Sequence, residues 1–179
     1  MLKYGGISMI KAVLEDITKM DVDAIVNSAN ERLTPGAGVS GAIHKAAGKE
    51  LAKECKKYGK LEDGNSVITK GYNLKAGYVI HTVAPKYYLE QENREELLRS
   101  CYKTSLKLAD ENNCKTIAFP AIGIGIYKWP INLGLSIAVE EVKKYLKDNN
   151  KNLEVVYFAC RNNEELAKTY QDLIDTITI

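Results

Sequence analysis

The stretch that decides the fold is Ala24-Ile25-Val26-Asn27-Ser28-Ala29-Asn30, which is followed, after four residues, by Pro35-Gly36-Ala37-Gly38-Val39-Ser40-Gly41-Ala42-Ile43-His44. An apolar run of this kind is typical of a buried strand, and here it leads through a glycine-rich loop directly into a helical pattern. Glycines let the backbone approach a phosphate closely, and the first amides of a helix have no intrahelical acceptors. The stretch therefore predicts an anion site that forms the floor of a nucleotide pocket.

A second glycine loop follows another strand candidate. Residues 116–119 are an apolar run that ends at Pro120, and residues 121–127 read Ala-Ile-Gly-Ile-Gly-Ile-Tyr. Either loop alone can be an ordinary strand-to-helix turn. Ligands of parallel sheets bind at the carboxyl ends of the strands, so both loops can lie at one edge. A facing pair can hold a diphosphate through backbone amides without a cationic side chain, and we predict such a diphosphate site.

Strand and helix patterns alternate along the rest of the chain. Further strands are expected at residues 10–14, 66–69, 78–83 and 153–159, and helices at 42–57, 93–112, 131–147 and 163–174. The helix from residue 42 carries one apolar stripe with Ser40 or Gly41 as its cap, the stripe being Ile43, Ala47, Leu51 and Cys55. This alternation predicts a layered α/β domain with a largely parallel sheet between helices.

Length and composition exclude several classes of protein. We expect the 179 residues to form one domain, 1–179. Lys and Arg number 25 against 23 Asp and Glu, and they are scattered, so nucleic-acid binding is not indicated. No apolar run approaches the roughly 20 residues of a membrane span. Without a signal peptide or a CxxC pair, we expect a cytoplasmic chain with free thiols and no metal.

The first glycine loop also matches the dinucleotide-binding pattern GxGxxG over residues 36–41. In a dehydrogenase, however, that motif turns directly out of its strand, whereas here nine residues, 27–35, lie between the apolar run and the glycines. No second strand ending in an acid follows about 20 residues later. The context therefore argues against a hydride-transfer enzyme.

Several polar side chains near the loops have two plausible roles. Asp16 ends the first strand, where a carboxylate either caps the following turn or accepts a hydrogen bond from an exocyclic amine such as that of adenine. Asn27 and Asn30 suit turns, but an amide also suits paired ribose hydroxyls, and Asn30 lies nearer the glycine loop. His44 and His81 are expected to be packing or core residues rather than members of a catalytic triad.

Taken together and in this order, these motifs resemble the macrodomain family. The resemblance rests on residues 24–30, 36–48, 68–74, 79–83, 117–122 and 125–127, and it covers nearly the whole chain from about Ile10. It implies a three-layer α/β/α sandwich with a mixed, largely parallel sheet, which binds ADP-ribose or ADP-ribosylated protein without a cofactor. The pattern is most similar to the branch that removes ADP-ribose from acidic side chains and deacetylates O-acetyl-ADP-ribose. We expect a monomer.

The resemblance also implies roles for individual residues. Asp16 and Ile17 would contact the adenine, Asn30 and Tyr127 the distal ribose. The diphosphate would lie between the two loops, at Gly36, Gly38, Val39, Ser40 and Gly41 on one side and at Ile122, Gly123, Ile124, Gly125, Ile126 and Tyr127 on the other. The aromatic residue that stacks on adenine in this family corresponds to Cys160. Phe158, on the same strand face, and Arg161 are the alternatives.

Ser40 is the main departure from the family pattern. In the hydrolytic branch the loop usually reads Gly-Gly-Gly-Val-Asp-Gly, and its Asp positions or activates the water. We expect Asn30, Ser40 and Tyr127 to be the catalytic residues, but a serine is no general base near neutral pH, a role typically worth about 10²–10⁴-fold in rate. An ADP-ribose-ester hydrolase and a reader of ADP-ribose without catalysis are therefore both open.

Overall fold

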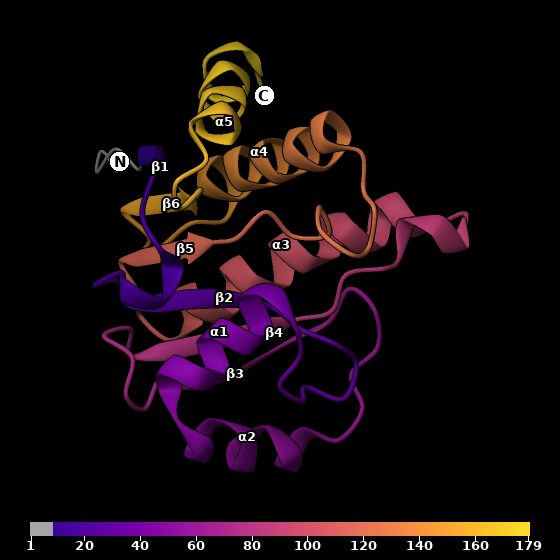
Figure 1. The fold of residues 1–179 in the computed structure, drawn as a ribbon. Helices are drawn as coiled ribbons and strands as arrows, with labels where there is room; N and C mark the ends of the chain where they lie inside the picture. The colour runs from indigo at the N-terminus through magenta and orange to yellow at the C-terminus, as the bar shows by residue number, and fades with distance from the viewer. Residues whose placement is uncertain (1–8) are drawn as a thin grey trace.

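Six strands form one mixed sheet in the computed structural model, which describes residues 9–179 (Figure 1). Their order is β1-β6-β5-β2-β4-β3. All neighbours are parallel except β3 and β4. The strands are β1 (Met9–Val13), β2 (Ala24–Ser28), β3 (Ser66–Lys70), β4 (Tyr78–Thr82), β5 (Thr116–Phe119) and β6 (Val155–Ala159). The first eight residues of the predicted domain lie outside the described part.

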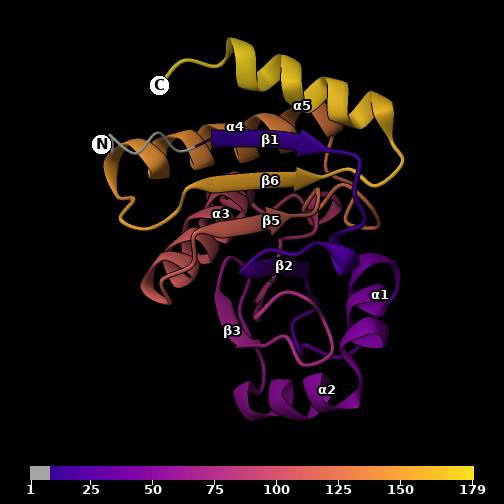
Figure 2. The same cartoon turned by 90° about the vertical axis from the view of Figure 1, so that its left-hand side faces the viewer.

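Helices cover both faces of the sheet, as Figures 1 and 2 show. On one face lie α3 (Arg94–Glu111), α4 (Ile131–Asp148) and α5 (Glu164–Thr176), and on the other α1 (Gly38–Ala47) and α2 (Lys49–Cys55). Three short 3₁₀ helices occupy connections: η1 (Ile17–Lys19), η2 (Lys56–Tyr58) and η3 (Tyr87–Leu89). The predicted three-layer α/β/α sandwich is confirmed. No helix within residues 9–179 combines the length and apolarity needed to cross a membrane.

Alternation along the central strand β2 divides the core between the two helix layers. Ala24 and Val26 belong to the cluster that contains the buried faces of α3 and α4, whereas Ile25 belongs to the cluster under α1 and α2. All three side chains are fully buried. A strand covered on both faces must be apolar at every position, which explains the continuous apolar run in the sequence.

The predicted helix over 42–57 is wrong in two respects. It begins at Gly38, with Ala37 as its N-cap, so the cap expected at Ser40 or Gly41 is also wrong. It breaks at Gly48, whose φ of 93° is open to glycine alone among common residues. A Cβ at that position would lie 2.9 Å from the Asn73 Nδ2. The chain restarts there as α2 with a new direction.

The sheet order brings the two glycine loops together. Strands β2 and β5 are parallel neighbours, with Ala24 opposite Ile117 and Ile25 opposite Ala118. Their carboxyl ends therefore meet at one edge, and the segments that follow them, residues 29–37 and 120–130, leave the sheet side by side. This edge of the sheet carries the candidate site.

Candidate functional site

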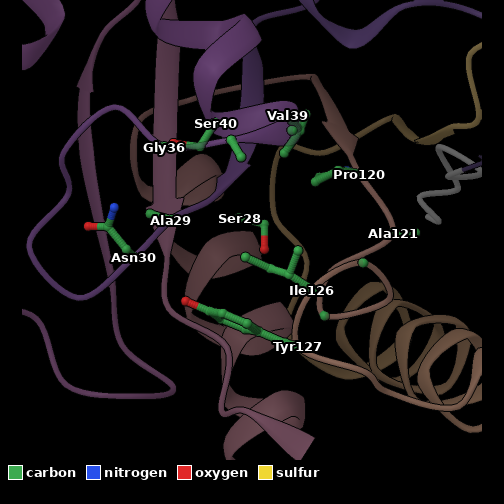
Figure 3. A pocket seen from close by; sticks show the side chains of 14 residues that line it. Ser28, Ala29, Asn30, Gly36, Val39, Ser40, Pro120, Ala121, Ile126 and Tyr127 are labelled. Atoms are coloured by element: carbon green, nitrogen blue, oxygen red, sulfur yellow. The ribbon is translucent and has the colours of Figure 1, made fainter.

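A pocket of about 340 Å³ lies between the two loops (Figure 3). Its floor comes from the end of β2, one wall from the loop that enters α1, and the other wall from the loop that follows β5. The lining residues are Ser28, Ala29, Asn30, Gly36, Ala37, Gly38, Val39, Ser40, Pro120, Ala121, Gly123, Gly125, Ile126 and Tyr127. Among residues 9–179, every side chain that lines this pocket is uncharged. An anion placed here would have to be bound by dipoles rather than by a lysine or an arginine.

The first wall offers unused backbone donors. Helix α1 starts at Gly38, and Ala37 provides no side-chain cap. The amides of residues 37–40 donate no hydrogen bond to any described group. They lie at the positive end of the helix dipole, so the start of α1 is an anion-binding geometry directed at the pocket.

Close packing of α1 against its own entry loop requires a glycine at position 41. A Cβ at Gly41 would lie 2.3 Å from the carbonyl oxygen of Gly36, a distance that no side chain tolerates. A Cβ at Gly36 would make only ordinary contacts, to Asn30 and Ser40 at 3.7–3.9 Å. The exposed loop 35–37 therefore rests directly on the backbone of the helix's first turn.

The second wall is braced from behind by Trp129, which is 2% exposed. Its indole Nε1 donates to the Pro85 carbonyl at 2.9 Å, and its backbone N–H donates to Gly123 O at 3.1 Å. Gly123 has φ 82°, and a Cβ there would lie 2.6 Å from the indole ring. The Tyr87 amide donates to Tyr127 O at 2.9 Å. The amides of residues 125–127 have no described acceptor and remain free to face a ligand.

Asn30 lies at the pocket, but its amide group is engaged with its own loop. The Nδ2 donates to Thr34 O and to Thr34 Oγ1, both at 3.0 Å, while the Oδ1 accepts from the amides of Arg32 and Thr34 at 3.1 Å. Figure 3 shows the amide directed away from Ile126 and Tyr127. In this structure Asn30 therefore shapes the loop, and contact with a ribose would replace some of these bonds.

Ser40 and His44 point to the same side of α1, four residues apart, and both are buried. The Ser40 Oγ and the two ring nitrogens of His44 have no partner among the described residues. Burial lowers the pKa of His44 below its ordinary value, so the ring stays neutral near pH 7. Buried polar atoms of this kind normally bond to water, and Ser40 can orient a water at the pocket wall.

His81 confirms the expectation of a core histidine. It is fully buried on β4 and contacts Asn27 Nδ2 through Nδ1 at 3.1 Å and Thr69 Oγ1 through Nε2 at 3.0 Å. The Asn27 NH₂ can only donate, so Nδ1 accepts and the ring carries its proton on Nε2. Burial, with a smaller contribution from His44, lowers the pKa of His81 to about 3.

Asp16, which the resemblance implies as an adenine contact, lies outside the pocket. Asp16 caps η1, where its Oδ1 accepts from Thr18 N at 3.0 Å and from Thr18 Oγ1 at 2.8 Å. Partial burial acts to raise the pKa of Asp16, but these bonds and the charges of Arg161 and Lys19 lower it below its ordinary value. Asp16 is thus a half-buried carboxylate at this edge of the sheet, outside the lining of the 340 Å³ pocket.

Phe158 does not offer its ring to this pocket, which corrects the alternative raised from strand alternation. It is fully buried and stacks on Tyr170 of α5, with ring centroids 4.4 Å apart and planes 7° from parallel. Cys160, 3% exposed, lies in the same core cluster, and burial raises the pKa of its thiol to about 11. Both side chains pack under α5 rather than at the open edge.

The structure thus brings together nine predicted site residues: Asn30, Gly36, Gly38, Val39, Ser40, Gly123, Gly125, Ile126 and Tyr127. It leaves out Asp16, Ile17, Gly41, Ile122, Ile124, Phe158 and Cys160. Ile17 and Ile122 are buried in the core, and Ile124 packs toward Gly134 of α4. The prediction omitted Ser28, Ala29, Ala37, Pro120 and Ala121, although their places directly at the ends of β2 and β5 or inside the first glycine loop were visible in the sequence.

Comparison with known proteins identifies the family. The chain matches the Macro domain model over residues 26–138. Macro domain-containing protein CT2219 of Chlorobaculum tepidum is 47% identical over 88% of this chain and 91% of its own length. ADP-ribose glycohydrolase MACROD2 of Xenopus laevis is 46% identical over 80% of this chain, and the match spans 34% of that longer protein.

A solved structure agrees with this result. The Trypanosoma brucei macrodomain in complex with ADP-ribose superposes with a TM-score of 0.83 at 36% identity, over 92% of this chain and 68% of that chain. The residues matched by the family model include both glycine loops. The protein described here therefore belongs to the Macro domain family.

Proposed function

We propose that the protein binds ADP-ribose in the 340 Å³ pocket and hydrolyses ADP-ribose esters, which include mono-ADP-ribosylated acidic side chains and O-acetyl-ADP-ribose. The observation that carries the proposal is a pocket walled by two sets of unused backbone amides and lined by no charged side chain within residues 9–179. Such walls suit a diphosphate. A macrodomain relative with ADP-ribose bound and a glycohydrolase relative, MACROD2, support it.

The arrangement of the walls suggests how the ligand lies. The diphosphate would sit between the amides of residues 37–40 and those of residues 125–127, with the distal ribose against Tyr127 and beside Asn30. Adenine would extend toward Asp16, whose lowered pKa keeps it a carboxylate that accepts from an exocyclic amine. Arg161, which follows β6, is the candidate for covering the base.

Hydrolysis would then rely largely on the substrate itself. In a substrate esterified at the anomeric carbon of the distal ribose, a water held by a phosphate oxygen, Asn30 and Ser40 would attack that carbon as the carboxylate leaves. The adjacent diphosphate would stabilise the positive charge that develops on the sugar, and Tyr127 would close the water in. This scheme needs no side-chain base, which fits the presence of a serine at position 40.

A reader that binds ADP-ribose without hydrolysis is the second candidate, and the serine at position 40 favours it. One experiment separates the two. The purified protein is titrated with ADP-ribose, AMP and NAD by calorimetry and then incubated with a target that carries ADP-ribose on glutamate. Binding of ADP-ribose with release above the uncatalysed rate supports a hydrolase. Binding without release supports the reader, and no binding contradicts both.

A further inference from the structure

A second cavity, of about 370 Å³, adjoins the first, and Asn30 and Tyr127 line both. We call it the side cavity. Its other walls come from the loop after β2, from Asp63 ahead of β3, and from the segment between β4 and α3, which includes Lys86 and Leu89. A group attached to a sugar that rests on Tyr127 would have this cavity as its neighbour.

The side cavity differs from the main pocket in charge. Glu31, Arg32, Asp63 and Lys86 all line it. Glu31 is paired with Lys60 at 3.7 Å, whereas none of the other three makes an ion pair with another described residue. The cavity thus holds two cations and one carboxylate that are not committed to fixed ion pairs.

Lys86 lies at the shared boundary, beside Tyr127. Its Nζ lies 5.7 Å from the centroid of the Tyr127 ring, within the range of a cation–π contact. Asp63 also affects Tyr127, because burial and the negative charge of Asp63 both raise the pKa of this tyrosine. Burial also raises the pKa of Asp63, and Lys86 opposes that rise. Lys86, Asp63 and Tyr127 therefore form one electrostatically coupled group at the junction of the two cavities.

We propose that the side cavity receives the acyl group esterified to the distal ribose and that Lys86 binds the carboxylate that forms. The proposal rests on the proposed function. Water oxygen bonds to the anomeric carbon, the bond from that carbon to the acyl oxygen breaks, and its electron pair stays on the acyl oxygen as a carboxylate. The proton of the water goes to solvent. A fixed cation beside that oxygen stabilises the charge as it develops.

Three variants test the role of Lys86. Lys86→Gln removes the charge, Lys86→Arg keeps it, and Lys75→Gln removes the charge of an exposed lysine outside both cavities. We expect Lys86→Gln to lower kcat/KM for release from a glutamate-linked peptide about tenfold, the loss typical of one charge-assisted contact. Lys86→Arg should restore most of the rate, and Lys75→Gln should match the wild type.

The affinity for free ADP-ribose, which carries no acyl group, should change less than about twofold in all three variants, since a tenfold change would need about 1.4 kcal/mol of lost contact. A rate unchanged in Lys86→Gln would overturn the proposal. Equal losses in rate and in ADP-ribose affinity would overturn it as well, because Lys86 would then serve the main pocket.

If the wild type releases no ADP-ribose, a binding experiment still distinguishes the side-cavity proposal from the proposed function. A peptide that carries ADP-ribose through a non-hydrolysable amide linkage should bind the wild type more tightly than ADP-ribose does, because its acyl group fills the side cavity. Lys86→Gln should keep most of that difference, since the uncleaved amide presents no carboxylate to Lys86. Equal affinities in the wild type would overturn the side-cavity proposal while leaving ADP-ribose binding intact. Failure of free ADP-ribose to bind would instead overturn the proposed function.

Discussion

Ser40 occupies the third position of α1, where its hydroxyl is buried at the pocket wall without a described partner. A carboxylate there would face the positive end of the helix dipole and could accept a proton from a bound water. We expect Ser40→Asp to speed the release of ADP-ribose from a glutamate-linked target by about tenfold or more, toward the range typical of general-base catalysis.

Ser40→Ala is the matched variant: it removes the hydroxyl that helps to hold the water, so its release rate should fall below that of the wild type rather than rise. Single-turnover assays at saturating enzyme measure both rates. A Ser40→Asp protein that binds ADP-ribose normally yet releases it no faster would show that a base at this position is not what limits the reaction.

His81 makes stability depend on pH. Its pKa is about 3 in the folded protein, whereas an unfolded histidine titrates near 6.5. Between these values only the unfolded chain takes up the proton. The contribution of His81 to the free energy of unfolding is therefore complete above about pH 6.5. Below that pH the contribution falls, with a slope that approaches about 1.4 kcal/mol per pH unit. The lowered pKa of His44 acts in the same direction.

Urea unfolding at several values between about pH 5 and 6.5, above the range where most carboxylates titrate, measures this slope. In His81→Gln the slope should be smaller, whatever the variant's absolute stability, because His44 is then the one histidine left to contribute. The same slope in both proteins would mean that His81 is protonated in the folded state or that other groups determine how stability falls at acid pH.

At the scale of elements, α1 and its entry loop form the wall of the pocket through one close contact. We expect Gly41→Ala to push the Gly36 carbonyl away, since its Cβ would lie 2.3 Å from that oxygen. The amides of residues 37–40 would move with the loop, and ADP-ribose affinity should fall by about tenfold or more, as one or two charge-assisted hydrogen bonds are lost.

Gly77→Ala is the control for Gly41→Ala, because the nearest atom to a Cβ there lies at an ordinary 3.5 Å and the residue is outside the pocket. Calorimetry with ADP-ribose compares the two variants, and thermal unfolding checks that both are folded. Equal affinities would show that loop 35–37 does not hold the diphosphate.

The positions of strands and helices followed from the sequence because their apolar periods are long and regular. The break at Gly48 did not, since Ile43 and Ala47 before it and Leu51 and Cys55 after it continue one stripe at four-residue spacing. Alternation likewise assigned Phe158 and Cys160 to one face of the sheet. Alternation cannot tell, however, that α5 and its Tyr170 cover that face.

At the scale of the whole molecule, the sheet order decides which loops meet. The family and the three-layer fold could be predicted, because the glycine loops and the alternation are local signals. The bracing of the loop after β5 by Tyr87 and Trp129, and the side cavity with Lys86, could not be predicted. They depend on the segment after β4 packing against the loop after β5, contacts between residues about 40 apart in sequence that no local pattern encodes.

A ligand that bridges the loop into α1 and the loop after β5 should add to the stability of the whole fold. If ADP-ribose binds only the folded chain, a concentration one hundred times its Kd adds about 2.7 kcal/mol to the free energy of unfolding. Denaturant unfolding with and without ADP-ribose measures the gain, and adenine alone, which has no diphosphate to bridge the loops, should give much less at the same concentration. Equal gains from both would contradict a diphosphate bound between the loops.

The brace at Trp129 has a consequence for the entropy of binding. Residues 120–130 are already held by the indole and by the bonds from Lys128, Trp129 and Tyr87, so this wall is preorganised. Residues 31–37 are mostly exposed, and Asn30 must exchange partners there. The conformational entropy lost when the complex forms therefore comes mainly from the wall that contains residues 31–37. Hydrogen–deuterium exchange should slow upon ADP-ribose addition mainly in residues 31–40, while the amide of Trp129 is protected before and after.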